Sequence, residues 1–353
     1  MTRRTLLGST AALLVGLAPL RCSSQGLPQA PPPGALEIPG VRVGHFTLPG
    51  GLTGCTVVLA EAGATAGGDV RGGAPGTVET ALLDPVNTVD FVNAVVFSGG
   101  SAYGLATRDG VMRFLEERGA GYPVGAAGVV PIVTGAIIFD LGLNPDGPRP
   151  GADCGYAAAE AAGVGPVEEG SVGAGAGATV GKLRGGTRSV KGGVGAATIR
   201  LESNGLIVSA LMVVNAVGDV VDPRTGAVVA GVRDDNGGFM DARRLLREEP
   251  APDAGGANTT IGVVLTNARL TKAEANKVAQ MAHDGLARAI VPSHTPADGD
   301  TMFSMATGHL VEGYSVSQVG ALAAEAVADA ILSAVRSATG AGGVPAIGEL
   351  PGR

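Results

Sequence analysis

The 353-residue sequence has no tryptophan, and aromatic residues make up only 3% of it. Charged residues are also scarce, at 16%, and because 45% of the residues are hydrophobic, a disordered or solvating protein is excluded. The net charge of −7 argues against the basic surface of a nucleic-acid-binding protein, so no nucleic-acid partner is expected. Three cysteines and four histidines leave little material for a metal site, and we expect neither a metal nor another cofactor.

Glycine, in contrast, is abundant. The chain has 59 glycines, more than double the usual share of about 7%, without a triplet repeat. The core must therefore be built from Ala, Val, Leu and Ile, with backbones packed closely together. In the glycine-rich segment 173–182, Ala176 and the following Leu183 break the spacing of a phosphate-binding loop, so these glycines also indicate tight backbone packing.

Residues 1–30 have the pattern of an export signal. Arg3 and Arg4 precede an apolar segment that is too short to span a membrane comfortably. The paired arginines are typical of the twin-arginine route, so we expect an exported protein, periplasmic or extracellular, without a stable membrane span. The alternative is an apolar N-terminus with no targeting role. The proline-rich segment 31–39 is expected to be a linker.

The three cysteines do not define a disulfide framework. Cys22 follows Arg21, which does not fit a lipidation motif. Cys55 and Cys154 could pair in an oxidising compartment, but both lie among small apolar residues. The sequence therefore favours two buried thiols.

Hydrophobic patterns predict a mixture of helices and strands. The pair Asn204-Gly205 between two apolar runs predicts a hairpin over residues 196–214. Thr271 and Glu274 form a capping box, which predicts the start of a helix. Further strands are expected at 92–97 and 261–265, and further helices at 102–118, at 156–162 and from Ser317. We expect a single domain with largely antiparallel sheets, stacked in layers.

Two other groups of residues do not fit known catalytic motifs. Ser101 lies in a segment similar to a hydrolase nucleophile elbow, but Tyr103 stands where that turn needs glycine, which favours a helix cap. The four histidines lack the spacing of metal ligands. They are expected to be surface residues or hydrogen-bonded polar residues.

The segment Asn258-Thr259-Thr260 follows a loop of small residues and precedes an apolar strand. Attack of the Thr259 hydroxyl on the Asn258 carbonyl would convert the peptide into an ester, which water could then hydrolyse. Thr259 would then carry a hydroxyl nucleophile and a free α-amine, a base with a pKa near ~7.7. Spacing alone also fits an ordinary strand with a polar cap.

Six motifs in order resemble the DmpA-type aminopeptidase family of autoproteolytic N-terminal-nucleophile hydrolases, which also contains the nylon-oligomer hydrolase NylC. They lie between about Gly40 and Ala334, at 41–45, 69–76, 98–105, 214–222, 258–261 and 298–303. The resemblance implies an α+β fold, a four-layer αββα sandwich of the Ntn-hydrolase and ornithine-acetyltransferase type. It also implies a large chain, 40–258, and a small chain, 259–353, that share one domain and assemble into a tetramer or larger homo-oligomer.

The resemblance also implies roles for single residues. Thr259 matches the family's nucleophile, and Asn258 matches the residue left at the end of the large chain. Asn215 matches a side-chain donor of the oxyanion hole, a group whose loss costs about 10²–10³ in rate. Lys182 matches a lysine that supports the threonine hydroxyl in NylC.

Asp298 and Asp300 match acidic or polar residues around the nucleophile, where a carboxylate can hold or orient the amine of Thr259. The alternative for this pair is an ordinary Asp-Gly-Asp turn. Phe139 stands where the family has a tyrosine next to the nucleophile. The oxyanion hole is therefore expected to lose that hydroxyl or to take a backbone N–H in its place.

The resemblance implies a self-cleaving amide hydrolase, an aminopeptidase or amidase that uses N-terminal Thr259 on small peptides or amino-acid amides. One alternative is an endo-type hydrolase of linear 6-aminohexanoate oligomers. Another is an acyltransferase of the ornithine-acetyltransferase kind. A third is a binding protein without enzymatic activity, in which Thr259 remains internal.

Overall fold

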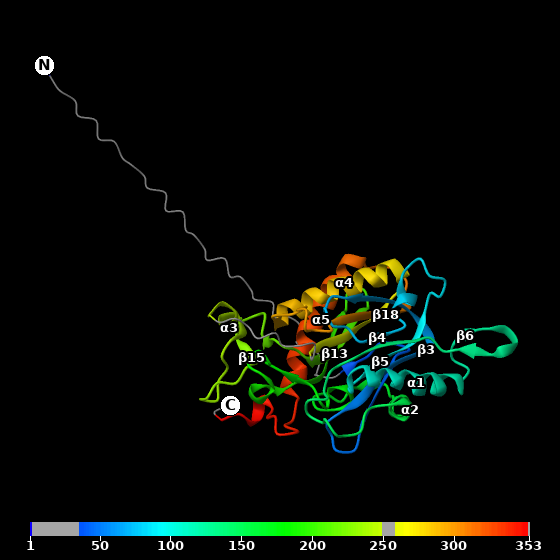
Figure 1. Cartoon of the computed structure of the whole chain (residues 1–353). Coiled ribbons are helices and arrows are strands. Elements are labelled where there is room, and N and C mark those ends of the chain that lie inside the picture. Colours follow the sequence, from blue (N-terminus) through cyan, green and yellow to red (C-terminus); the bar gives the residue numbers. More distant parts are fainter. Residues whose placement is uncertain (2–34, 249–257, 352–353) are drawn as a thin grey trace. The chain divides into compact units, whose positions relative to one another are not determined.

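The computed structural model describes residues 1, 35–248 and 258–351 (Figure 1). The predicted export signal, 1–30, with Cys22, lies outside this range apart from its first residue. The folded part begins within the predicted linker 31–39, because Ala35–Leu36 form β1 and pair with β9, Gly165–Pro166.

One long strand, β3 (Gly54–Val70), joins two halves of a mixed sheet. Its first part pairs with β2 and β5, and its last part pairs with β18. The first half contains β2 (Arg42–Thr47), β5 (Val92–Ser98), β8 (Val133–Ile137) and β4 (Thr77–Val78). The second half contains β18 (Thr301–Leu310), β16 (Thr259–Ala268), β13 (Leu206–Asn215) and β12 (Gly193–Leu201).

The pairing within this sheet is largely antiparallel, as expected. The parallel pairs among its described strands are β5 with β8 and β16 with β18. Shorter strands flank the sheet: β6 (Tyr122–Pro123), β7 (Val129–Val130), β10 (Thr179–Val180), β11 (Val190–Lys191), β14 (Asp219–Val221), β15 (Val228–Ala230) and β17 (Ile290–Val291).

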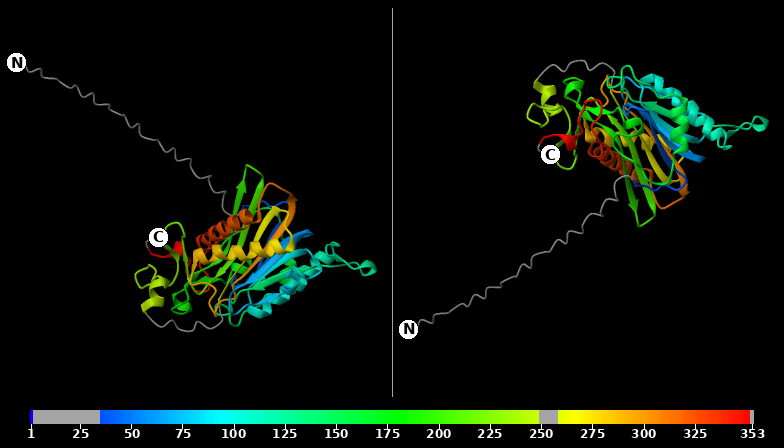
Figure 2. Two further views of the ribbon diagram at one scale, coloured as in Figure 1. Left: turned by 90° about the horizontal axis from the view of Figure 1, so that it is seen from above. Right: turned by 90° about the horizontal axis from the view of Figure 1, so that it is seen from below.

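Helices cover both outer faces of the folded half-sheets (Figures 1 and 2). The helices are α1 (Thr107–Glu116), α2 (Ala152–Glu160), α3 (Ala242–Glu248), α4 (Lys272–Ala289) and α5 (Val316–Arg336). Apolar side chains of α1 and α2 pack on the first half, and those of α4 and α5 pack on the second. A third apolar layer lies between the halves, where the rings of Phe97 and Phe303 are 6.2 Å apart. The predicted four-layer αββα fold is confirmed.

Glycine allows the layers to approach closely. A Cβ on Gly110 of α1 would lie 1.7 Å from the carbonyl oxygen of Ala152 at the start of α2. A Cβ on Gly195 of β12 would lie 2.1 Å from the carbonyl oxygen of Ala330 in α5. The segment 173–182 follows the same rule, because a Cβ on Gly175 would lie 2.4 Å from the Val194 nitrogen. The expected tight backbone packing is confirmed.

Most local predictions agree with the structure. The hairpin is formed by β12 and β13, and the capping box at Thr271 begins α4. Ser101 is not the cap of α1: it starts a separate 3₁₀ helix with a left-handed φ of 55°, and α1 begins at Thr107. The last helix is capped by Ser315 rather than begun at Ser317. Turn geometry, which apolar spacing does not encode, accounts for both differences.

Helix α5 is the one described helix that is long and apolar enough to cross a membrane by length and composition. Its apolar window is 67% buried inside the fold. Its alanine-rich face packs against β12 and β13 in the layer between α5 and the sheet. The helix therefore has the pattern of a core helix.

The prediction of two buried thiols is wrong, because Cys55 of β3 and Cys154 of α2 form a disulfide. The pair is separated by 99 residues in sequence. The packing of α2 on β3 brings the two sulfurs together, and no local pattern in the sequence reports that contact.

Replacing Cys55 and Cys154 together by alanine should lower the free energy of unfolding by about 2–4 kcal/mol, because the disulfide restrains the unfolded chain. Urea unfolding with and without reductant measures this effect. Reductant should lower the urea midpoint of the parent chain and should leave the midpoint of the double variant unchanged. Equal unfolding midpoints for the parent and the double variant would contradict this structural role.

Candidate active site

Thr259 is the first residue of β16, between β13 and β18 in the second half of the sheet. Its side chain is almost completely enclosed, with 3% of the residue exposed. Side chains alternate along a strand, so Thr259 shares the face of Ile261 and Val263, which belong to the apolar layer between the half-sheets. The predicted strand therefore presents its first hydroxyl inside the sandwich.

The peptide carbonyl between Asn258 and Thr259 is held from two sides. The backbone N–H of Gly299 donates to the Asn258 oxygen at 2.9 Å, and the Thr259 hydroxyl donates to the same oxygen. A Cβ on Gly299 would lie 2.9 Å from Thr259 Oγ1 and 2.7 Å from the Ala74 oxygen. A side chain at position 299 would therefore disturb the threonine. Sequence reasoning missed Gly299, because a backbone donor leaves no trace in side-chain patterns.

Asn215 is the last residue of β13 and lies opposite Thr259 in the antiparallel register. Its Nδ2 donates to the Phe139 carbonyl oxygen at 3.0 Å. Its Oδ1 accepts from the Thr179 N–H at 3.0 Å and from Lys182 Nζ at 2.9 Å. These three contacts fix the amide orientation, so its nitrogen and oxygen face different partners.

Two lysines lie on this side of the fold, Lys182 partly buried and Lys191 completely buried. Lys182 Nζ also donates to the Asn215 carbonyl oxygen at 3.1 Å, and burial lowers the pKa of Lys182 to about 7, against the opposing charge of Asp298. Lys191 Nζ donates to the Ala176 carbonyl oxygen at 2.5 Å, and burial lowers the pKa of Lys191 to about 8. Both ammonium groups are therefore less favourable in the folded chain than in water.

These pKa shifts predict how stability depends on pH. From about pH 7 to 10.5 the unfolded chain keeps protons that the folded lysines have released, so the free energy of unfolding rises with pH. We expect an increase of about 1 kcal/mol from pH 7 to pH 9, below the formal value because water screens partly exposed charges. Urea unfolding at both pH values measures it, and Lys191→Met should reduce the dependence while leaving the contribution of Lys182. A midpoint that falls over this range would contradict the shifts.

Asp298 and Asp300 lie close together in the segment immediately before β18. Asp298 Oδ2 accepts from the Thr295 N–H at 3.1 Å and hydroxyl at 2.5 Å, and Asp298 Oδ1 faces the Val217 N–H at 3.5 Å. Burial, together with the charge of Asp300, raises the pKa of Asp298. Asp300 Oδ1 accepts from the Thr260 N–H at 2.8 Å. Asp300 is therefore bonded directly to the residue that follows Thr259.

The sequence missed a histidine at this place. His294 donates its backbone N–H to Asp300 Oδ2 at 2.9 Å, and its ring Nδ1 lies 2.9 Å from the same oxygen. His283 of α4 packs edge-on against the His294 ring, with ring centres 4.7 Å apart. His283 is completely buried and its Nε2 bonds to the Asp69 carbonyl oxygen, so of the two expected environments it has the hydrogen-bonded one rather than the surface one. The loop that returns from β17 to β18 brings these rings together, and no sequence spacing indicates this.

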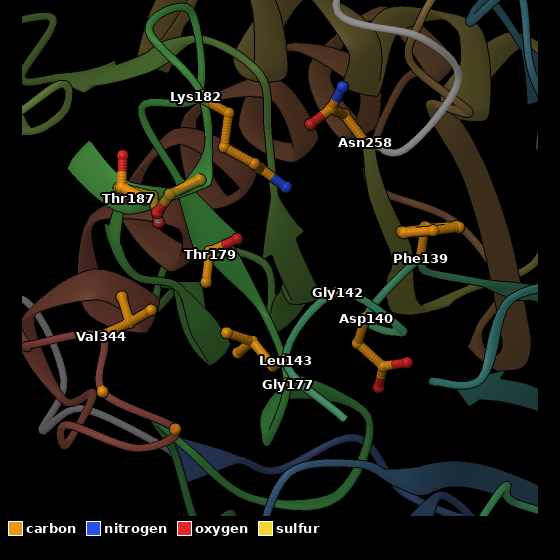
Figure 3. Close-up of a pocket in the computed structure, with 15 residues that line it drawn as sticks. Phe139, Asp140, Gly142, Leu143, Gly177, Thr179, Lys182, Thr187, Asn258 and Val344 are labelled. Atoms are coloured by element: carbon orange, nitrogen blue, oxygen red, sulfur yellow. Dashed lines mark hydrogen bonds between the residues drawn. The ribbon is translucent and has the colours of Figure 1, made fainter. Parts of the chain in front are cut away.

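A cavity of about 670 Å³ opens beside these residues (Figure 3). Lys182 extends its side chain into the cavity, and Asn258 and Phe139 form part of its wall. Glycines and apolar side chains such as Leu143 and Val344 line much of the remainder. Asn258 lines the cavity directly, so a molecule in the cavity would approach Thr259 from the Asn258 side.

Asp140 contributes a carboxylate to the lining of this cavity. Its oxygens accept from the Thr53 hydroxyl at 2.6 Å and from the Gly100 N–H at 2.7 Å, and burial raises its pKa. Within residues 35–248 and 258–351, no group of three or more His, Cys, Asp and Glu side chains has the geometry to hold a metal ion. The chemical groups gathered here are a hydroxyl, an amide, amines and carboxylates, which suit proton transfer and acyl transfer.

Proteins similar in sequence to this chain include an aminopeptidase and an oligomer endohydrolase. An uncharacterized aminopeptidase of Mycobacterium bovis is 45% identical over 344 residues, which cover 88% of this chain and 95% of the relative. A 6-aminohexanoate-oligomer endohydrolase of Kocuria sp. is 34% identical over 316 residues, which cover 85% of each chain.

Two solved structures are similar in fold. A beta-aminopeptidase of Burkholderia sp. has a TM-score of 0.64 and 25% identity, over 88% of this chain and 89% of that chain. An L-aminopeptidase D-Ala-esterase/amidase of Ochrobactrum anthropi, described as a variant of the Ntn hydrolase fold, has a TM-score of 0.66 and 19% identity, over 87% of each chain. Residues 36–346 match the family model of peptidase family S58. The chain belongs to peptidase family S58 and is a hydrolase that acts on amide bonds.

Proposed function

We propose that this hydrolase cleaves its own chain between Asn258 and Thr259 and then uses Thr259 as an N-terminal nucleophile. The observation that carries the proposal is the scissile carbonyl itself, which accepts both the Thr259 hydroxyl and the Gly299 N–H. In the first step, Thr259 Oγ1 adds to the Asn258 carbonyl carbon. The C–N bond breaks, the nitrogen takes a proton, and an ester remains. Water then hydrolyses the ester, leaving a carboxylate on Asn258 and a free amine on Thr259.

Turnover of a substrate repeats this chemistry. The Thr259 amine takes the hydroxyl proton while Oγ1 attacks the substrate carbonyl, and the protonated amine then donates to the leaving amine. Water releases the acyl group from Oγ1. The Gly299 N–H stabilises the negative oxygen, because it already holds a carbonyl oxygen at that place. Asn215, fixed opposite Thr259, supplies the second donor.

Phe139 replaces the tyrosine expected from the family resemblance, and its role changes accordingly. The Phe139 backbone oxygen orients the Asn215 amide, while the ring forms part of the cavity wall. The backbone N–H of Gly299 takes the place of a tyrosine hydroxyl as an oxyanion donor. Of the two expected consequences of Phe139, loss of the donor or its replacement by a backbone N–H, we propose the second, and the Gly299 N–H that bonds to the Asn258 oxygen supports it.

Lys182 and the aspartates support the nucleophile by charge and orientation. Lys182 holds both oxygens of Asn215, and its lowered pKa of about 7 lets it exchange a proton near neutral pH. Asp298 and Asp300 lie beside the peptide that becomes the new N-terminus. A carboxylate there stabilises the ammonium form of the Thr259 amine between steps.

Small peptides and amino-acid amides are the proposed substrates. A second candidate is the interior amide of linear 6-aminohexanoate oligomers, because the glycine-rich and apolar cavity wall fits an unbranched aliphatic chain. The similarity to the Kocuria endohydrolase supports the same candidate. We further propose that the chain is exported through its 1–30 segment and forms a homo-oligomer. The Cys55–Cys154 disulfide supports export, because such bonds persist in oxidising compartments.

A substrate panel with a nucleophilic trap tests the proposed function. Purified protein is incubated with peptide amides, free peptides and 6-aminohexanoate oligomers, with and without hydroxylamine. We expect hydrolysis of at least one class, hydroxamate products in the trap, and an acyl adduct on the fragment that begins at Thr259. An amine acceptor in place of hydroxylamine separates hydrolysis from acyl transfer. Turnover with the adduct on another residue would overturn the assignment of Thr259.

A further inference from the structure

We propose that His294 is a positioning residue for the nucleophile, because it clamps the Asp300 carboxylate that holds the start of β16. The proposal rests on the proposed function of Thr259. Asp300 lies between the two elements, with one oxygen bonded to the Thr260 N–H at 2.8 Å and the other bonded twice to His294 at 2.9 Å. The carboxylate is nearly completely buried, so water does not compete for these bonds.

The clamp is built by an unusual backbone. His294 has a φ of 56°, in the left-handed region where few residues other than glycine lie, although histidine tolerates it better than most. This conformation points both the backbone N–H and the ring Nδ1 of one residue at a single carboxylate oxygen. Strained conformations of this kind cluster at functional sites.

The rings next to the clamp retain unsatisfied atoms. His283 Nε2 lies 3.0 Å from the Asp69 carbonyl oxygen and so donates to it. His283 Nδ1 and His294 Nε2 are buried without a hydrogen-bond partner in the described structure. A buried polar atom without a partner lowers stability, and apolar residues would avoid this loss. The imidazole at 294 is therefore explained better by the bond that it makes to Asp300 than by packing.

The clamp also controls charge beside the nucleophile. The Asp300 charge raises the pKa of Asp298, and Asp298 in turn opposes the lowering of the Lys182 pKa. Charged or titratable groups near the His294 ring include His283 of α4, which packs against it, and the ion pair of Asp69 in β3 with Arg71 just after β3. Asp300, rather than any of these three groups, is the residue that His294 contacts by hydrogen bonds. Loss of the ring donor would leave Asp300 Oδ2 bonded to the backbone N–H of His294 alone, so the negative charge of Asp300 would lose one of the donors that stabilise it.

A matched pair of variants tests the clamp. His294→Asn keeps a donor near the position of Nδ1 and tolerates the left-handed backbone. His294→Gln carries the same amide one methylene further, near the position of Nε2. The rate of chain cleavage is followed by cell-free synthesis and denaturing gels, across pH. Urea unfolding reports whether each variant folds.

We expect His294→Asn to cleave within about threefold of the parent rate and His294→Gln to cleave about 10–100-fold more slowly, because a misplacement of about 1 Å can reduce a rate by 10². The acid limb of the pH profile should move to higher pH in His294→Gln alone, which a purely structural role would not produce. Equal rates and profiles for folded His294→Gln and the parent would overturn the clamp, as would equally slow asparagine and glutamine variants. A parent chain that never cleaves would instead overturn the proposed function, and with it this inference.

Discussion

Thr259→Ala is expected to leave one continuous chain and to lower amide turnover by about 10⁴-fold or more, because both the nucleophile and its amine are lost together. Thr259→Ser keeps a hydroxyl and releases an amine, so it should still cleave and turn over substrate. Intact mass and initial rates on the preferred amide measure both effects. The large expected effect follows from one residue supplying two catalytic groups.

The neighbouring threonine provides the matched control for this experiment. Thr260 follows Thr259 on the same strand, and its hydroxyl is buried without a hydrogen-bond partner among the described residues. Thr260→Val has nearly the same shape and keeps the backbone N–H that bonds to Asp300. It should cleave and turn over substrate like the parent chain. Full turnover by uncleaved Thr259→Ala would assign the nucleophile to another residue.

Asn215→Asp is expected to lower kcat by about 10²–10³ with a smaller change in KM, because it removes the proposed donor to the developing oxyanion. The aspartate still accepts from the Thr179 N–H and from Lys182, although it loses the bond that Nδ2 donates to the Phe139 carbonyl oxygen. Steady-state kinetics on the cleaved protein, together with urea unfolding, measure the result.

Asn215→Ala serves as the comparison for the aspartate variant. It should lose the same catalytic donor and also lower the free energy of unfolding by about 1–3 kcal/mol, because the buried Lys182 and Thr179 donors lose an acceptor. A wild-type kcat in the folded aspartate variant would remove Asn215 from the oxyanion hole. The two variants thus separate the catalytic contribution of this amide from its structural one.

Local signals in the sequence predicted local structure well. Asn204-Gly205 specified its hairpin, and Thr271 with Glu274 specified the start of α4, because both depend on neighbours in sequence. The long strand β3 was not predicted. This strand is rich in small residues, so its hydrophobic pattern is weak. It belongs to both half-sheets because its first part pairs with β5 and its last part pairs with β18.

The candidate site divides in the same way. Thr259 and Asn215 were found through motifs, and the structure brings them opposite each other in adjacent strands. Gly299 and His294 were not found. Gly299 contributes through its backbone, and His294 reaches Asp300 through the turn before β18 and packs on a helix. Contacts of this kind arise from tertiary packing, which residue type and spacing do not report.

The mass of the purified protein under denaturing conditions tests the central claim most directly. Our account predicts two chains, the smaller one beginning at Thr259 and the larger one ending at Asn258. It also predicts that Thr259→Ala gives a single chain of the combined mass. A parent protein that hydrolyses amides while its chain runs unbroken through this junction would contradict the account.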